Sequence, residues 1–242
     1  MIRIVLHHTC KSSYTLYKAL KGVGGIKFEM ASTPYFTYLK DYVFSVPAVF
    51  YGNELILLDP VEPDDVMTLK EGKNKRELAI DEAIENFARG IMASQAILTT
   101  VMLHKSLKPA LDPHLVSILS RAKYHSQEEK LPQIVETIVR QEGKILTEHW
   151  ETFVKLLTYG FIRELMWLEV EIDEVDKSHI KTWLLAKATV GRLGLPHPRP
   201  TVPQDVVEAV YTTLKEAGGR YLGRLKEEQQ ILQNDAEFLS LY

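Results

Sequence analysis

The sequence has very little cysteine, with Cys10 alone among 242 residues. One cysteine excludes a disulfide within the chain and any zinc site that needs several thiolates. Scarce cysteine is typical of reducing compartments, so we expect a cytoplasmic protein. The histidines show no Glu-x-x-His or His-x-x-x-His spacing on a helix, and we predict no metal site.

Long hydrophobic runs and an excess of positive charge are also missing. No run approaches the ~20 apolar residues that span a bilayer, and the apolar start MIRIVL meets His7 and His8 without a small-residue cleavage site. We therefore predict no membrane segment and no signal peptide. The formal net charge is −3, which argues against a nucleic-acid partner because such surfaces are usually basic. The remaining composition, 45% hydrophobic and 25% charged, is that of an ordinary globular chain.

The first part of the chain alternates between strand and helix patterns. Short apolar runs rich in β-formers predict strands over 2–6 and 26–30 and a hairpin over 47–58. Helical spacing with stop signals predicts helices over 13–22, 35–44 and 63–72. The order is β-α-β-α-β-β-α, and we expect a mixed four-stranded α/β domain over residues 1–74.

From about residue 75 every periodic segment is helical. Helices are predicted over 75–103, 131–141, 149–168, 179–194, 203–218 and 220–242. A proline-rich connection over 195–203 interrupts them. We therefore predict a larger all-α domain over residues 75–242.

Cys10 lies where the first strand ends and the first helix begins. Unpaired N–H groups and the helix dipole at such a position favour an anion, which lowers the pKa of a thiol from ~8.5. Lys11 adds a nearby positive charge. The alternative is a small buried residue at the end of a strand. The residues around Cys10 leave both interpretations open.

Val46-Pro47 stands just before the predicted hairpin. Proline removes a ladder donor, so it is tolerated where a strand starts. A cis bond here would leave the backbone N–H and C=O of Val46 available to a peptide-like ligand. With a trans bond, Pro47 would simply be the first residue of a strand. Both forms are compatible with the sequence.

Together these residues resemble the thioredoxin superfamily in its short, glutaredoxin-like form. Cys10-Lys11-Ser12-Ser13 matches its Cys-x-x-Ser motif at a helix start, and Val46-Pro47 matches the pair that contains its cis proline. The resemblance implies a thioredoxin-like domain in which Cys10, Ser13 and Pro47 lie together.

The same segment also resembles two narrower families. Asp64 and Asp65 match the acidic pair of glutaredoxins. The Val-Pro-Ala hairpin is similar to that of glutathione transferases, where a serine usually meets the γ-glutamyl end of glutathione. Asp59 occupies that place here, where an aspartate would repel a carboxylate but could pair with an amino group. The helical half is also similar to the architecture of these transferases.

The resemblance implies monothiol chemistry with Cys10 as nucleophile and Ser13 as a hydrogen-bond partner of the thiolate. Val46 and Pro47 would hold a thiol peptide, with Lys11, Asp59, Asp64 and Asp65 as further binding residues. Because Ser13 cannot form a second disulfide, resolution needs glutathione, another small thiol or a cysteine of a partner protein. No bound cofactor is expected. The alternatives are a glutathione-transferase-like conjugating enzyme and a non-catalytic binding protein with a degenerate fold. The oligomeric state stays open, a homodimer included.

Overall fold

The computed structural model describes residues 1–31, 44–191 and 201–241 of the chain. These residues form two compact units. The first unit contains residues 1–94, 112–137 and 229–242, and the second contains residues 95–111 and 138–228. The first unit is therefore assembled from three separate segments. The domain boundary at residue 74, placed on secondary structure alone, stays a prediction.

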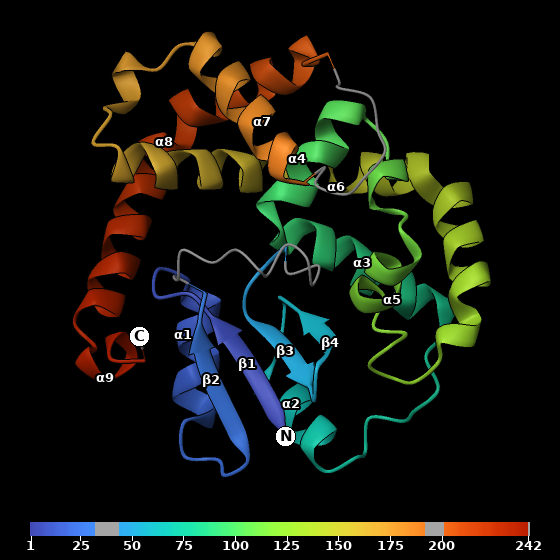
Figure 1. Ribbon diagram of the computed structural model, residues 1–242. Helices are drawn as coiled ribbons and strands as arrows, with labels where there is room; N and C mark the ends of the chain where they lie inside the picture. Colours follow the sequence, from blue (N-terminus) through green and yellow to red (C-terminus); the bar gives the residue numbers. More distant parts are fainter. Residues whose placement is uncertain (32–43, 192–200, 242) are drawn as a thin grey trace. The chain divides into compact units, whose positions relative to one another are not determined.

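The first unit contains a mixed four-stranded sheet in the order β2-β1-β3-β4 (Figure 1). Its strands are β1 (Ile2–Leu6), β2 (Ile26–Met30), β3 (Ala48–Tyr51) and β4 (Glu54–Leu58). β1 is parallel to β2, whereas β1–β3 and β3–β4 are antiparallel. Gly52 turns the hairpin with a φ of 63°, which glycine adopts without steric cost. The predicted strands and hairpin are confirmed.

The helices α1 (Lys11–Leu20) and α2 (Pro63–Lys70) supply side chains to the core on one face of this sheet. α2 has proline in its first turn and two aspartates that suit the helix dipole. The fully or almost fully buried side chains of this core include Ile2, Ile4, Leu6, Leu16, Tyr17, Leu20, Val66 and Leu69. The helix predicted over 35–44 lies, except for its last residue, outside the described residues.

The long helix predicted over 75–103 is wrong, because the structure has two helices there. α3 (Ile80–Ala93) and α4 (Gln95–His104) are separated at Ser94, which has an extended backbone with φ −104° and ψ 106°. The Ser94 hydroxyl donates a hydrogen bond of 2.9 Å to the carbonyl of Phe44. Serine side chains that bond to backbone groups outside the helix compete with helix continuation. The periodic spacing of apolar residues continues on both sides of such a break, so it does not predict where the first helix ends.

Gly90 of α3 packs closely against Leu119 at the end of α5 (Pro113–Leu119). A Cβ added there would lie 2.7 Å from Cδ2 and 3.2 Å from Cβ of Leu119, which is buried. We expect Gly90→Ala to lower the free energy of unfolding by about 1–3 kcal/mol through overpacking. Gly143→Ala is the control, since nothing lies within 4 Å of its Cβ position, and it should stabilise by about 0.5–1 kcal/mol. Denaturant unfolding measures the free energy of unfolding of both variants. A change of the same sign in the two variants would contradict the prediction.

The second unit is helical and contains α4, α7 (Lys177–Gly191) and most of α6 (Leu131–Trp167) and α8 (Gln204–Gln233). The helices predicted over 131–141 and 149–168 are one continuous helix, because the residues between them are mostly good helix formers. The predicted stop at Gly218 is also wrong, since α8 continues through it. α4 packs against α7, and the Thr100 hydroxyl donates to the carbonyl of Ala188 at 3.4 Å.

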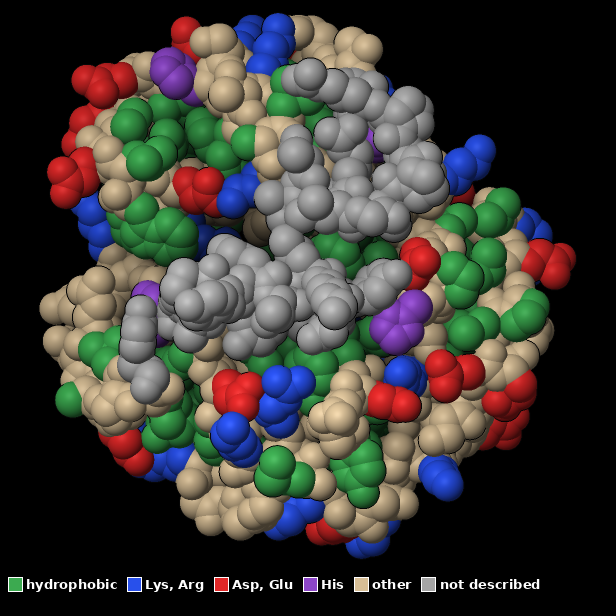
Figure 2. All heavy atoms as spheres, in the orientation of Figure 1, with side chains coloured by type: hydrophobic (Ala, Val, Ile, Leu, Met, Phe, Trp, Pro, Cys, Tyr) green, Lys and Arg blue, Asp and Glu red, His purple; other side chains and the backbone are tan. Residues whose placement is uncertain are grey.

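The surface carries charges of both signs. On the face in Figure 2, lysine and arginine side chains alternate with carboxylates over the described residues, in keeping with the small net charge of −3. Within the described ranges, no helix is both long and apolar enough to cross a membrane.

Candidate functional site

Cys10 caps the N-terminus of α1. After β1 the chain turns through His7–Thr9, and the Cys10 amide donates to the carbonyl of His7 at 3.0 Å. Cys10 then has the extended backbone of an N-cap residue, and its Sγ accepts from the Ser13 amide at 3.5 Å. The sulfur thereby takes one of the donors that a helix start leaves unpaired. The predicted strand–thiol–helix arrangement is confirmed.

The Val46–Pro47 peptide bond is cis, which decides between the two forms that the sequence left open. The Cys10 thiol donates to the carbonyl oxygen of Val46 at 3.4 Å. The two motif halves, 36 positions apart, therefore meet directly at the start of β3. The contact is made by the backbone of Val46.

Ser13 and Lys11 lie beside Cys10 in different ways. Ser13 is fully buried, and its hydroxyl accepts from the His7 amide at 3.2 Å. The backbone amide of Ser13 donates to the Cys10 sulfur. Lys11 is exposed, and its ammonium lies 5.4 Å from the ring centroid of Tyr14. The serine hydroxyl thus fixes the turn that presents the cysteine.

The turn before Cys10 is stabilised by contacts that the sequence does not predict. His7 and His8 stack with ring centroids 4.6 Å apart, and Nδ1 of His7 lies 2.8 Å from the Thr9 hydroxyl. The Gln229 amide donates to the Thr9 carbonyl at 3.0 Å. Gln229 is buried and 220 positions away, so no local pattern could have identified it.

Asp59 lies next to the first turn of α1. Burial raises the pKa of its carboxyl to about 7, the hydrogen bond from Ser12 lowers it, and the Glu62 carboxylate raises it. A cavity of about 210 Å³ opens here, with Lys11 and Ser12 on one side and the segment from Asp59 to Pro63 on the other. The structure therefore brings the predicted residue Asp59 to the helix that carries Cys10.

The shifted pKa of Asp59 predicts a pH-dependent stability. A carboxyl with a raised folded-state pKa keeps its proton in the native state where the unfolded chain has released it, so stability falls as pH rises from about 4 to about 7. Asp59→Asn removes this fall while its amide oxygen still accepts from Ser12. Relative to the parent protein, the variant should gain about 2 kcal/mol of unfolding free energy between pH 4 and pH 8, allowing for partial solvent exposure.

Denaturant titrations at several pH values measure this difference. Asp64→Asn, at an exposed position in the first turn of α2, is the matched control and should follow the parent profile. If the stability of Asp59→Asn changed with pH in the same way as that of the parent protein, the raised pKa of Asp59 would be contradicted.

Asp65 is engaged in structural contacts. Arg121 donates to both of its carboxylate oxygens at 2.8 and 2.9 Å, and also to the carbonyl of Pro60 at 2.9 Å. The amide of Glu62 adds a further hydrogen bond of 2.9 Å to Oδ2 of Asp65. This carboxylate joins the start of α2 to the segment after α5. A binding role for Asp64 and Asp65 stays a prediction.

Among the described residues, no group of three or more His, Cys, Asp or Glu side chains is placed to hold a metal ion. The site thus consists of one thiol at a helix start, a backbone carbonyl before a cis proline, and a neighbouring carboxyl. A scan against family models and searches of curated proteins and of solved structures found no match.

Proposed function

We propose that residues 1–74 form a thioredoxin-like domain and that the protein is a monothiol thiol-disulfide oxidoreductase with Cys10 as its nucleophile. One observation carries the proposal: Cys10 caps α1 and faces the carbonyl of Val46, the residue before a cis proline. The sheet order β2-β1-β3-β4, with β1 parallel to β2 and β3 antiparallel to β1, supports the fold assignment.

The reaction runs in two exchanges. The Cys10 thiolate attacks one sulfur of a disulfide, a new S–S bond forms, and the other sulfur leaves as a thiolate that takes a proton from water. Ser13 supplies no second sulfur, so an external thiolate such as that of glutathione attacks the mixed disulfide. Cys10 leaves as a thiolate, and the external sulfur forms a disulfide with the group that Cys10 carried. Each cycle therefore consumes one external thiol and exchanges one disulfide for another.

Two hydrogen bonds at the sulfur oppose each other. The Ser13 amide and the helix N-terminus favour the thiolate, whereas the bond from the thiol to the Val46 carbonyl exists only in the protonated form. When the proton leaves, the carbonyl of Val46 becomes available to a backbone N–H of a bound peptide. Ionisation of Cys10 and binding of an extended substrate would therefore favour each other.

The proposal is tested by the ionisation and trapping of Cys10. The rate of alkylation by iodoacetamide as a function of pH should show a pKa well below the ~8.5 of a free thiol. Glutathione disulfide should then add one glutathione to Cys10 by mass spectrometry. A pKa at or above ~8.5 with slow addition would support a non-catalytic binding protein instead.

A glutathione-transferase-like conjugating activity is the second candidate, and Asp59 favours it. Its carboxyl borders the cavity at the first turn of α1, where it would pair with the amino group of a γ-glutamyl end. A conjugation assay with glutathione and an electrophilic aryl halide separates the two activities, because only exchange requires a disulfide substrate.

A further inference from the structure

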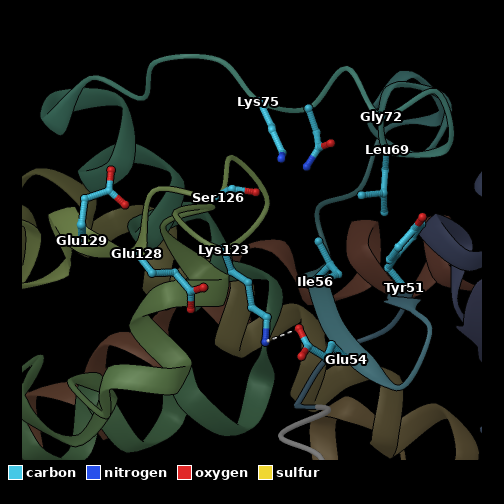
Figure 3. A pocket seen from close by; sticks show the side chains of 11 residues that line it. Tyr51, Glu54, Ile56, Leu69, Gly72, Lys75, Lys123, Ser126, Glu128 and Glu129 are labelled. Carbon is cyan, nitrogen blue, oxygen red and sulfur yellow. Dashed lines mark ion pairs between the residues drawn. The ribbon is translucent and has the colours of Figure 1, made fainter.

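A second cavity lies at the opposite end of the sheet from Cys10. Tyr51 pairs with Ile2 at the start of β1, whereas Cys10 follows the end of that strand. The β3–β4 turn, the end of α2 and the segments 72–75 and 123–129 enclose about 610 Å³ (Figure 3). This volume is within the range of small-molecule sites, ~300–1,000 Å³.

The two segments that form its walls, 72–75 and 123–129, are connected by hydrogen bonds. The side-chain amide of Asn74 donates to the carbonyl of Tyr124, and Nδ1 of His125 lies 2.9 Å from the carbonyl of Asn74. The Leu78 amide donates to the side chain of Gln127 at 3.0 Å. These reciprocal bonds fix a segment without secondary structure of its own, so the cavity is preorganised and a ligand need not order it.

One side of the cavity carries an exposed cation and an exposed hydroxyl that have no partner among the described residues. Lys75 points into the space between the loops, next to Ser126 (Figure 3). Among the described residues, the Lys75 ammonium has no ion pair, and the Ser126 hydroxyl has no hydrogen bond. Ser126 also has a φ of 55°, a left-handed conformation that is uncommon outside glycine and that clusters at binding sites.

The opposite side has an acidic excess. Glu54 forms an ion pair of 3.4 Å with Lys123, and Glu128 accepts from the Ser117 hydroxyl through one oxygen at 2.8 Å. Glu129 lines the cavity as well, so three carboxylates share it with the ammoniums of Lys123 and Lys75 (Figure 3). Carboxylates therefore outnumber ammoniums at the cavity, and Lys75 is the lining lysine without a carboxylate partner among the described residues.

One wall of the cavity is apolar. Ile56 and Leu69 are 8% and 6% exposed and line the cavity, and Tyr51, with 53% exposure, stands at its margin. An exposed aromatic ring beside buried aliphatic side chains is a suitable surface for an apolar or aromatic group of a ligand.

We propose that this cavity binds a short peptide with free ends and apolar side chains. Its carboxylate pairs with the Lys75 ammonium and the Ser126 hydroxyl, and its ammonium pairs with Glu54 and Glu128. The side chains lie on Ile56, Leu69 and Tyr51. A purely anionic ligand would meet the acidic side, and a purely cationic one would leave Lys75 unpaired, so the charge pattern favours a zwitterion.

Isothermal titration of the full-length protein with the dipeptide Leu-Phe tests the proposal. Binding of Leu-Phe is expected with a dissociation constant of about 1 mM or lower, and N-acetyl-Leu-Phe-amide, which lacks both charges, should bind at least ~10-fold more weakly. Lys75→Gln and Glu128→Gln should each weaken Leu-Phe binding by about 10-fold. The glutamine at 128 still accepts from Ser117, so the loop keeps its bond.

Matched controls use charges next to the cavity that do not line it. Lys73→Gln removes an exposed ammonium paired with Glu71, and Glu77→Gln removes a carboxylate that is 91% exposed; each should change affinity by less than about 2-fold. Cys10→Ser should leave binding unchanged, which separates this site from the proposed function. The proposal would be overturned if no binding of Leu-Phe were seen at a peptide concentration about 10-fold above the expected dissociation constant. Equal affinity for the blocked peptide, or equal effects of Lys73→Gln and Lys75→Gln on affinity, would also overturn it.

Discussion

Replacing Cys10 by serine is expected to lower the rate of thiol–disulfide exchange by at least about 10³-fold. The reaction needs a sulfur that ionises near neutral pH and can form a mixed disulfide, and a serine hydroxyl does neither. No other cysteine exists in the chain, so no second thiol replaces it. The assay follows removal of glutathione from a fluorescent mixed-disulfide peptide in the presence of glutathione and glutathione reductase.

Serine at position 10 should leave the fold intact. It is among the favoured residues at a helix N-cap, so the unfolding free energy of Cys10→Ser should stay within about 1 kcal/mol of the parent. Loss of activity is then attributable to the missing sulfur. If the variant kept more than about a tenth of the parental rate, Cys10 would not be the nucleophile.

Phe238→Ala is expected to lower the free energy of unfolding by about 3–5 kcal/mol. Phe238 belongs to α9 (Ala236–Leu239) and is fully buried against α1, beside which α9 lies in Figure 1. Its ring is 5.2 Å from that of Tyr14, edge to face, and 5.4 Å from that of Tyr17. Alanine would leave a cavity beneath α1, the helix that begins at Cys10.

The polar contacts around Phe238 cannot compensate for its loss. Asp235 caps α9 by accepting from the Phe238 amide at 3.0 Å, and its other oxygen accepts from Tyr14 and from Lys18. These bonds hold the pKa of Asp235 at about 2. They orient the segment, but the apolar area buried by the ring supplies most of the stabilisation.

Leu239→Ala is the control for Phe238→Ala. Leu239 lies in the same short helix but is 36% exposed, and its truncation should cost less than about 1 kcal/mol. Urea titration followed by far-ultraviolet circular dichroism measures both variants. Equal effects of the two substitutions would show that the C-terminal segment contributes nothing specific to the packing of α1.

The strands and the helices α1 and α2 of the first part could be predicted because their signals are local. IRIVL and IKFEM are runs of β-formers bounded by polar residues, and Pro63 with Gly72 marks the start and the end of α2. The boundaries of the long helices were predicted wrongly because they depend on contacts between residues far apart in the sequence. Ser94 interrupts the apolar period where its side chain bonds to the carbonyl of Phe44, 50 positions away, whereas α8 continues through Gly218.

At the candidate site, residue types and chain order were enough to place Cys10 at a helix start and to pair it with Val46-Pro47. They did not indicate which atoms meet. The thiol bonds to the carbonyl of Val46, and the Ser13 hydroxyl bonds to the His7 amide. Sequence motifs specify side chains, but these contacts depend on backbone geometry.

The sequence by itself determined the element types of the described residues of the first part, the single thiol and its position between strand and helix. Only the tertiary structure decided that residues 229–241 pack on α1, that Asp59 reaches Ser12, and that two loops enclose a charged cavity beside β4. The physical reason is the range of the interactions. Propensity, capping and apolar period act within a few residues, whereas burial and pKa shifts depend on distant neighbours, such as Tyr14 and Asp235, which are 221 positions apart.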